Sequence, residues 1–186
     1  MAGTATVLTY MILGACRPRR EPTDFLVYKT AHVAVALWVL GSAKHLWLRS
    51  RDWTTADTGL LLCAVTWLSG WGWLLIHTWT AFRLVHHWSH AAAFADTART
   101  AGVGEGVYVN YLVLLVWGLD ATWLAAAPER YARRPRWVGW VVHGFLAFVM
   151  FNATVVYGHW PTQWAGVGWF AILGLSVVRR QMGRPA

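Results

Sequence analysis

Five long apolar stretches constrain the fold of this 186-residue chain more than any other feature. An α-helix rises 1.5 Å per residue, so segments of about 17–25 residues cross the roughly 30 Å hydrocarbon core of a membrane. A backbone inside that core must satisfy its hydrogen bonds internally, and helices do so. The sequence therefore predicts an all-α integral membrane bundle of five transmembrane helices, near residues 24–47, 58–85, 106–127, 137–158 and 163–179.

A sixth apolar stretch, residues 4–16, is shorter than these five. It adds a sixth transmembrane helix if it crosses at a tilt, and otherwise it is an interfacial or re-entrant segment. The polar connections are too short to hold a soluble domain. We therefore predict a single transmembrane bundle over residues 1–186, with a short apolar N-terminal segment, residues 1–23, whose topology stays open.

The composition agrees with a membrane location. Only 13% of the residues are charged, whereas soluble domains carry about 25%. The chain also has 15 tryptophans, and tryptophan is enriched at membrane interfaces because its ring is apolar while its N–H stays hydrated.

The net charge of +8 comes from short arginine runs between the apolar stretches. This placement favours contacts with lipid headgroups and gives no indication of nucleic-acid binding. When the connections alternate across five helices, one side receives ten lysines and arginines and the other receives five. The positive-inside rule makes the first side cytoplasmic, so the segment HHWSH at 86–90 is predicted to face outward.

That segment holds the densest group of histidines. His86 and His90 are four residues apart, which places them on one face if a helix continues through them. Neutral imidazole is a common ligand of copper, iron and zinc. We therefore predict a metal site formed by His86, His87 and His90 and closed by His159. The alternative is a polar collar, since histidine and tryptophan at a helix end also anchor the helix at the interface.

Three further histidines lie inside apolar stretches. His32, His77 and His143 are the candidates for cofactor binding, as axial ligands of a haem b inside the bundle. The alternative role of each is a hydrogen bond to a neighbouring helix. His143 and Asp120 come out at a similar depth near the cytoplasmic side, where they form a second possible polar layer, either a buried structural pair or a proton relay.

Three segments, HHWSHAAAFADTA, GVYVNYLVLLVWGLDATW and RPRWVGWVVHGFLAFVMFNATVVYGH, resemble a group of bacterial multi-spanning membrane proteins. The resemblance covers about residues 77–160 and includes His77, His86, His87, His90, Asn110, Asp120, His143, Asn152 and His159. It implies a common helical core, in the inner (cytoplasmic) membrane of a bacterium. It carries no activity and no ligand set.

These observations lead to a hypothesis about function. We expect a redox-linked membrane subunit that binds haem b or a transition metal through histidines in its outer half, and that works within a larger membrane complex. The expected partners are membrane lipids, other membrane subunits, and a quinone or pigment, with no nucleic acid. The alternatives are a non-catalytic scaffold or assembly subunit and, as a further class, a small-solute transporter. The sequence leaves open whether the protein is an enzyme.

Overall fold

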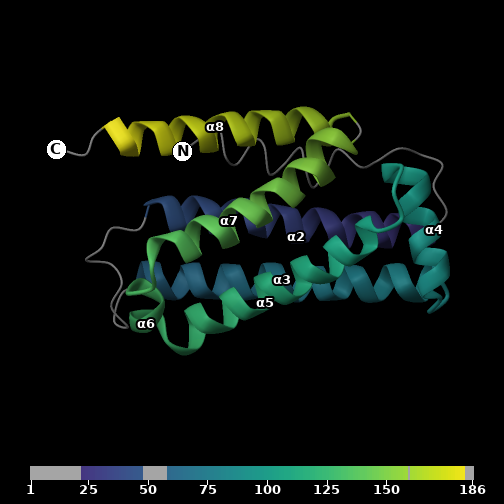
Figure 1. Ribbon diagram of the computed structural model, residues 1–186, viewed down its shortest axis with the longest axis horizontal. Coiled ribbons are helices and arrows are strands. Elements are labelled where there is room, and N and C mark those ends of the chain that lie inside the picture. Colours follow the sequence, from purple (N-terminus) through teal and green to yellow (C-terminus); the bar gives the residue numbers. More distant parts are fainter. Residues whose placement is uncertain (1–21, 48–57, 159, 183–186) are drawn as a thin grey trace.

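The computed structural model describes residues 22–47, 58–158 and 160–182, and this part of the chain is built from helices (Figure 1). The prediction of an all-α fold is confirmed. A short π-helical turn, η2 (Asn152–Val156), follows α7 directly. The long helices are α2 (Pro22–Trp47), α3 (Thr58–Leu84), α5 (Gly106–Ala126), α7 (Arg136–Phe151) and α8 (Thr162–Met182).

Four helical segments have the length and hydropathy needed to cross a membrane: Phe25–Leu46, Thr58–Leu84, Gly106–Ala126 and Arg136–Val156. They correspond to the first four of the five predicted transmembrane helices. The fifth prediction falls on α8, which is 21 residues long but is not among these four. The sixth, residues 4–16, lies outside the described residues. The protein is therefore described as a membrane protein with four candidate transmembrane helices.

The core forms where α2, α3 and α5 pack against one another. The most extensive contact is between α2 and α3, and α5 also packs against α3. Trp67 of α3 and Trp117 of α5 are fully buried, with their ring centroids 5.2 Å apart. Small residues make room for these rings, as Gly70 does for Trp117. Close backbone approach at small residues is the usual way in which transmembrane helices associate.

The chain between α3 and α5 differs from its prediction. Instead of a polar connection, residues His90–Ala101 form a helix, α4, which lies across one end of the bundle (Figure 1). The side chain of Ser89 accepts a hydrogen bond from the backbone N–H of Ala92 and caps its start. Gly102 ends the helix in the left-handed conformation, with φ of 80°.

A sharp turn separates α3 from α4. His87 and Trp88 both have positive φ, 47° and 61°, which is uncommon for residues with a side chain. The helix therefore does not continue from Leu84 to His90, and His86 and His90 do not share a helical face. The geometric basis of the predicted chelate was wrong, because the chain must turn here to lie across the bundle end.

The opposite end of the bundle is closed by a five-residue helix, α6 (Pro128–Ala132). Proline suits the first position of a helix because the N–H that it lacks would have no partner there. The short helix folds the chain back over the end of α5 and buries Tyr131. The connection to α7 then runs through Arg134 and Pro135. This end of the bundle holds the site described below.

The close packing of α3 against α5 gives a stability prediction. A Cβ at Gly70 would lie 2.6 Å from an atom of the Trp117 ring, whereas a Cβ at Gly72 meets nothing within 4 Å. We expect Gly70→Ala to cost about 1–3 kcal/mol through overpacking. Gly72→Ala is the matched control in the same helix, and should be neutral or stabilising because alanine favours helices by about 1 kcal/mol. Thermal unfolding in mild detergent measures both, and equal effects would contradict the packing described.

Candidate functional site

A cluster of polar side chains lies inside the bundle near α6. His45 comes from the last turn of α2, Asp120 from α5 and His143 from α7. The potential ligand atoms of these three side chains all lie within 4.8 Å of one another. This is the one group of three or more histidine, cysteine or acidic side chains with such spacing among the described residues. We call these three residues the His45 cluster.

The carboxylate of Asp120 is the centre of the hydrogen bonding. Its Oδ2 atom accepts from the indole N–H of Trp67 at 2.9 Å and from the hydroxyl of Tyr131 at 3.0 Å. Its Oδ1 atom accepts from the guanidinium of Arg134 at 2.6 Å. Asp120 and Arg134 form a buried ion pair, with 2% and 9% of their side chains exposed. Both oxygens of the carboxylate therefore accept hydrogen bonds from protein donors.

Arg134 links the carboxylate to His143. A second guanidinium nitrogen lies 3.1 Å from Nε2 of His143. A guanidinium only donates, so Nε2 must accept, and the proton of the neutral imidazole then lies on Nδ1. The same guanidinium lies over the ring of Tyr131, 3.6 Å from its centroid. Arg134 thus holds three groups of the site in one arrangement.

The orientation of His45 follows from similar reasoning. Its Nδ1 atom lies 2.9 Å from the carbonyl oxygen of Gly41. A carbonyl only accepts, so Nδ1 carries the proton, and Nε2 is the nitrogen with a lone pair. Nε2 lies 3.2 Å from the hydroxyl of Tyr131. The ring centroids of His45 and His143 are 4.8 Å apart, which is direct contact.

The hydroxyl of Tyr131 lies between Asp120 and His45. Burial, together with the nearby Asp120 carboxylate, raises the pKa of Tyr131 above its ordinary value. The hydroxyl therefore keeps its proton and acts as a donor. Its one proton has two acceptors within reach, Oδ2 of Asp120 and Nε2 of His45.

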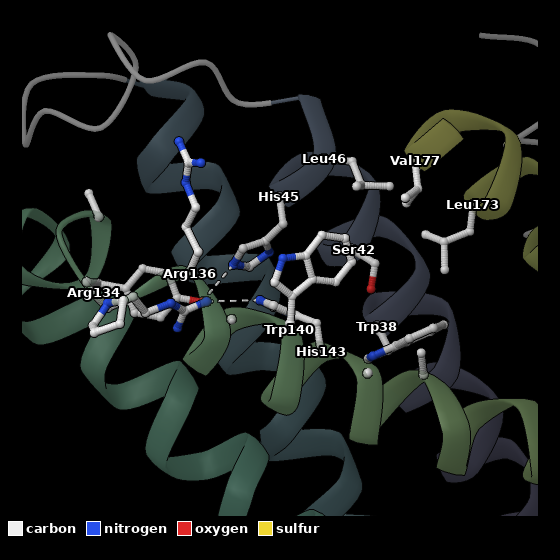
Figure 2. Close-up of a pocket in the computed structure, with 16 residues that line it drawn as sticks. Trp38, Ser42, His45, Leu46, Arg134, Arg136, Trp140, His143, Leu173 and Val177 are labelled. Carbon is white, nitrogen blue, oxygen red and sulfur yellow. Dashed lines mark hydrogen bonds between the residues drawn. The ribbon is translucent and has the colours of Figure 1, made fainter. Parts of the chain in front are cut away.

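A cavity of about 500 Å³ borders the cluster between α2, α7 and α8 (Figure 2). One wall is polar and includes Tyr131, Arg134 and the two imidazoles of the His45 cluster. The other wall is apolar. Its side chains are those of Trp38, Leu46, Trp140, Ala147, Leu173 and Val177. Pockets of roughly 300–1,000 Å³ with a few converging polar groups are typical binding sites for small molecules.

The predicted cofactor ligands are separated by the fold, and only His143 lies in the cluster. His77 faces α2, where its Nδ1 atom is 3.0 Å from the carbonyl oxygen of Val27. His32 lies on α2 with its Nε2 atom 3.2 Å from the hydroxyl of Thr162. Both therefore make contacts of the kind that join neighbouring helices. Their roles in cofactor binding stay predictions.

The predicted metal ligands lie at the other end of the bundle. His86 and His87 are in the turn after α3, and His90 begins α4, where its Nδ1 atom is 3.0 Å from the hydroxyl of Tyr111. His159 lies outside the described residues. Whether these four histidines bind a metal stays a prediction.

The other members of the site carry weaker sequence signals. His45 lies at the end of an apolar stretch beside Lys44, and the sequence analysis does not single it out. Arg134 enters that analysis only through the count of basic residues that sets the orientation. The similar depth of Asp120 and His143 is the signal that points to this end of the bundle.

Comparisons with known proteins add no family to this description. No family model matches the chain, and neither a curated protein nor a solved structure matches it. The resemblance noted from the sequence therefore stays an expectation.

The buried ion pair gives a testable ranking of stabilities. Asp120→Asn leaves the Arg134 charge buried without its partner and should cost about 3–5 kcal/mol. The double variant Asp120→Asn/Arg134→Gln removes both charges and should be less unstable than Asp120→Asn alone. Asp96→Asn is the control, because the Asp96–Arg99 pair is exposed and such pairs contribute about 0.2–1 kcal/mol. Chemical unfolding in detergent gives the order, and a double variant that is less stable than Asp120→Asn would contradict it.

Proposed function

We propose that the protein is a redox-linked integral membrane subunit that binds one transition-metal ion at the His45 cluster. The observation that carries this proposal is the convergence of two imidazoles and a carboxylate from three helices. Ionisable groups at membrane depth are costly, and they mark functional sites by default. This site lies at the opposite end of the bundle from the outer histidines that the sequence favoured.

The ligand types suit a metal that takes part in redox chemistry. Two histidines and one carboxylate that leave positions open are the ligand set of many non-haem iron sites, and imidazole also suits copper and zinc. A ligating histidine commonly donates its other N–H to a backbone carbonyl, as His45 does to Gly41. A ligating carboxylate is commonly hydrogen-bonded as well, as Asp120 is by Trp67 and Tyr131.

The spacing of the ligands requires a contraction. Bonds of about 2.1 Å to a metal place two ligand atoms at most about 4.2 Å apart. The atoms of the cluster lie within 4.8 Å of one another, so the longest separation must shorten by about 0.6 Å or more, and ligands that meet the ion at right angles must approach to about 3.0 Å. The direct contact of the two imidazole rings favours a bare ion over haem, since two axial ligands of a haem lie on opposite faces of the macrocycle.

Arg134 is the competitor of the metal. Its guanidinium bonds Oδ1 of Asp120 and Nε2 of His143, two of the atoms that a metal needs. It therefore supplies the positive charge that a metal would otherwise bring to the carboxylate. Arg134 also lines the adjacent cavity, which gives its side chain room to move away. On this proposal, a bound metal ion replaces the Arg134 guanidinium as the cation beside Asp120.

We propose that α8 is a fifth transmembrane helix, because it has the same length as α5 and runs alongside the long helices (Figure 1). The cluster then lies toward the cytoplasmic face of a bacterial inner membrane, where the basic residues of the connections concentrate. Other membrane subunits and lipids are the proposed partners.

The alternative is a scaffold or assembly subunit in which the cluster is a fixed polar lock. The specific observation in its favour is the complete hydrogen bonding of Asp120 by protein groups alone. On that alternative the protein binds no ion and removal of Arg134 only destabilises it.

Metal binding is tested by titrating Co²⁺ into the purified protein and following its visible absorption. We expect saturation at one ion per chain in the wild type. Arg134→Ala should bind at least about tenfold more tightly, which corresponds to about 1.4 kcal/mol, because the competing cation is gone. His143→Ala should lose the signal.

His90→Ala is the control for this titration. It removes an imidazole at the other end of the bundle and should bind Co²⁺ as the wild type does. Loss of binding in His90→Ala with retention in His143→Ala would instead place the metal among the outer histidines. Absence of saturable binding in both the wild type and Arg134→Ala would leave the scaffold alternative.

The fifth transmembrane helix is tested by reporter fusions that distinguish the two sides of the membrane. Fusions after residues 98 and 132 should report opposite sides, because α5 separates them. If α8 crosses, a fusion after residue 186 reports the same side as residue 132. The same side as residue 98 would show that α8 does not cross.

A further inference from the structure

The cavity beside the His45 cluster carries an inference that does not depend on the metal. We propose that it binds a neutral planar ring that carries carbonyl or hydroxyl oxygens, the chemistry of a membrane quinone. Its volume of about 500 Å³ and its division into one polar and one apolar wall suit an amphipathic small molecule.

An unpartnered donor points to the polar part of the ligand. Trp38 is 2% exposed and lines the cavity, and its indole N–H has no hydrogen-bond partner among the described residues. Buried polar groups in folded proteins are almost always bonded, so each exception needs an explanation. An oxygen of a ligand in this cavity is an acceptor for that N–H. Figure 2 shows Trp38 opposite the side of the cavity that holds His143 and Arg134.

The charges around the cavity favour a neutral ligand over an anion. No carboxylate is among the described residues that line it. The lining side chains alone would therefore be positively charged. The charge of Arg134 is balanced by Asp120, which lies behind the cavity wall. The buried part of the wall is therefore rich in donors but close to neutral overall. Arg136, the second arginine of the lining, is an exposed residue.

Further donors lie on the polar wall. The proton of the neutral His143 is on Nδ1, since its Nε2 atom accepts from Arg134. Ser42 also lines the cavity and offers its hydroxyl as a donor. A molecule with oxygens at two ends of one ring can therefore meet donors from α2 and from α7. A purely apolar ligand would leave these groups unsatisfied.

The apolar wall suits a flat ring with a hydrocarbon tail. Trp38 and Trp140 offer aromatic surfaces, and aromatic rings pack well against one another in offset or edge arrangements. Leu173 and Val177 come from α8 and face Leu46 of α2 across the cavity (Figure 2). A ligand that enters from the membrane would place its tail along these side chains.

The test is a titration of a decyl-substituted benzoquinone into detergent-solubilised full-length protein treated with a chelator, followed by calorimetry. We expect saturable binding of one molecule per chain in the wild type. Trp38→Phe keeps an aromatic ring but removes the N–H, and should weaken binding up to about tenfold, the effect of one hydrogen bond. Trp140→Ala removes an exposed side chain of the wall and should also weaken binding without disturbing the core.

Trp137→Phe is the matched control, since Trp137 lies on α7 outside the cavity lining and is exposed. It should bind the quinone as the wild type does. Wild-type binding in both Trp38→Phe and Trp140→Ala, or no saturable binding at all, would overturn the inference. Saturable binding of decanoate in preference to the quinone would overturn it in favour of an anionic amphiphile. Because the metal is removed beforehand, none of these results bears on the proposed metal site.

Discussion

The buried pair of Asp120 and Arg134 is the interaction on which this end of the molecule depends. Two charges removed from water cost several kcal/mol each, on the order of what their attraction returns. The pair is retained here with added donors from Trp67 and Tyr131, so that the carboxylate is fully bonded. These contacts join α3, α5, α6 and the connection between α6 and α7 at one point.

Several features of the fold bring these side chains to the Asp120 carboxylate. The five-residue helix α6 turns the chain back so that Tyr131 and Arg134 reach the carboxylate from the end of the bundle. A proline at its start and another before α7 fix this path. Gly70 lets α3 and α5 approach closely enough for Trp67 to reach Asp120. The polar cluster and the close helix packing are therefore parts of one arrangement.

Much of the architecture could be predicted because hydrocarbon imposes simple rules. The lengths of the apolar stretches predicted the four candidate transmembrane helices to within a few residues. The helix α4 was missed because few of its residues are large and apolar, although Ser89 and Gly102 are residues of the type that begin and end helices. The turn at His87 and Trp88 has no glycine or proline to indicate it.

The site was harder to predict for a different physical reason. Depth along a helix is readable from the sequence, and it placed Asp120 and His143 together. Contacts between helices also require the rotation of each helix about its axis, which a nearly uniformly apolar segment does not reveal. Arg134 and Tyr131 reach the site through a short connection whose path depends on packing. The densest histidine motif lies at the other end of the bundle, so it gave no indication of this cluster.

The central claim, that His45 and His143 hold a metal together, is tested most directly by counting imidazoles on the ion. Electron spin-echo envelope modulation of the protein loaded with one equivalent of Cu²⁺ reports the nitrogens of coordinated histidines. We expect two coordinated imidazoles in the wild type and no coordinated imidazole from this site in His143→Ala, which should no longer bind the ion. Three imidazoles that are unaffected by His143→Ala, or a copper signal without histidine nitrogens, would contradict it.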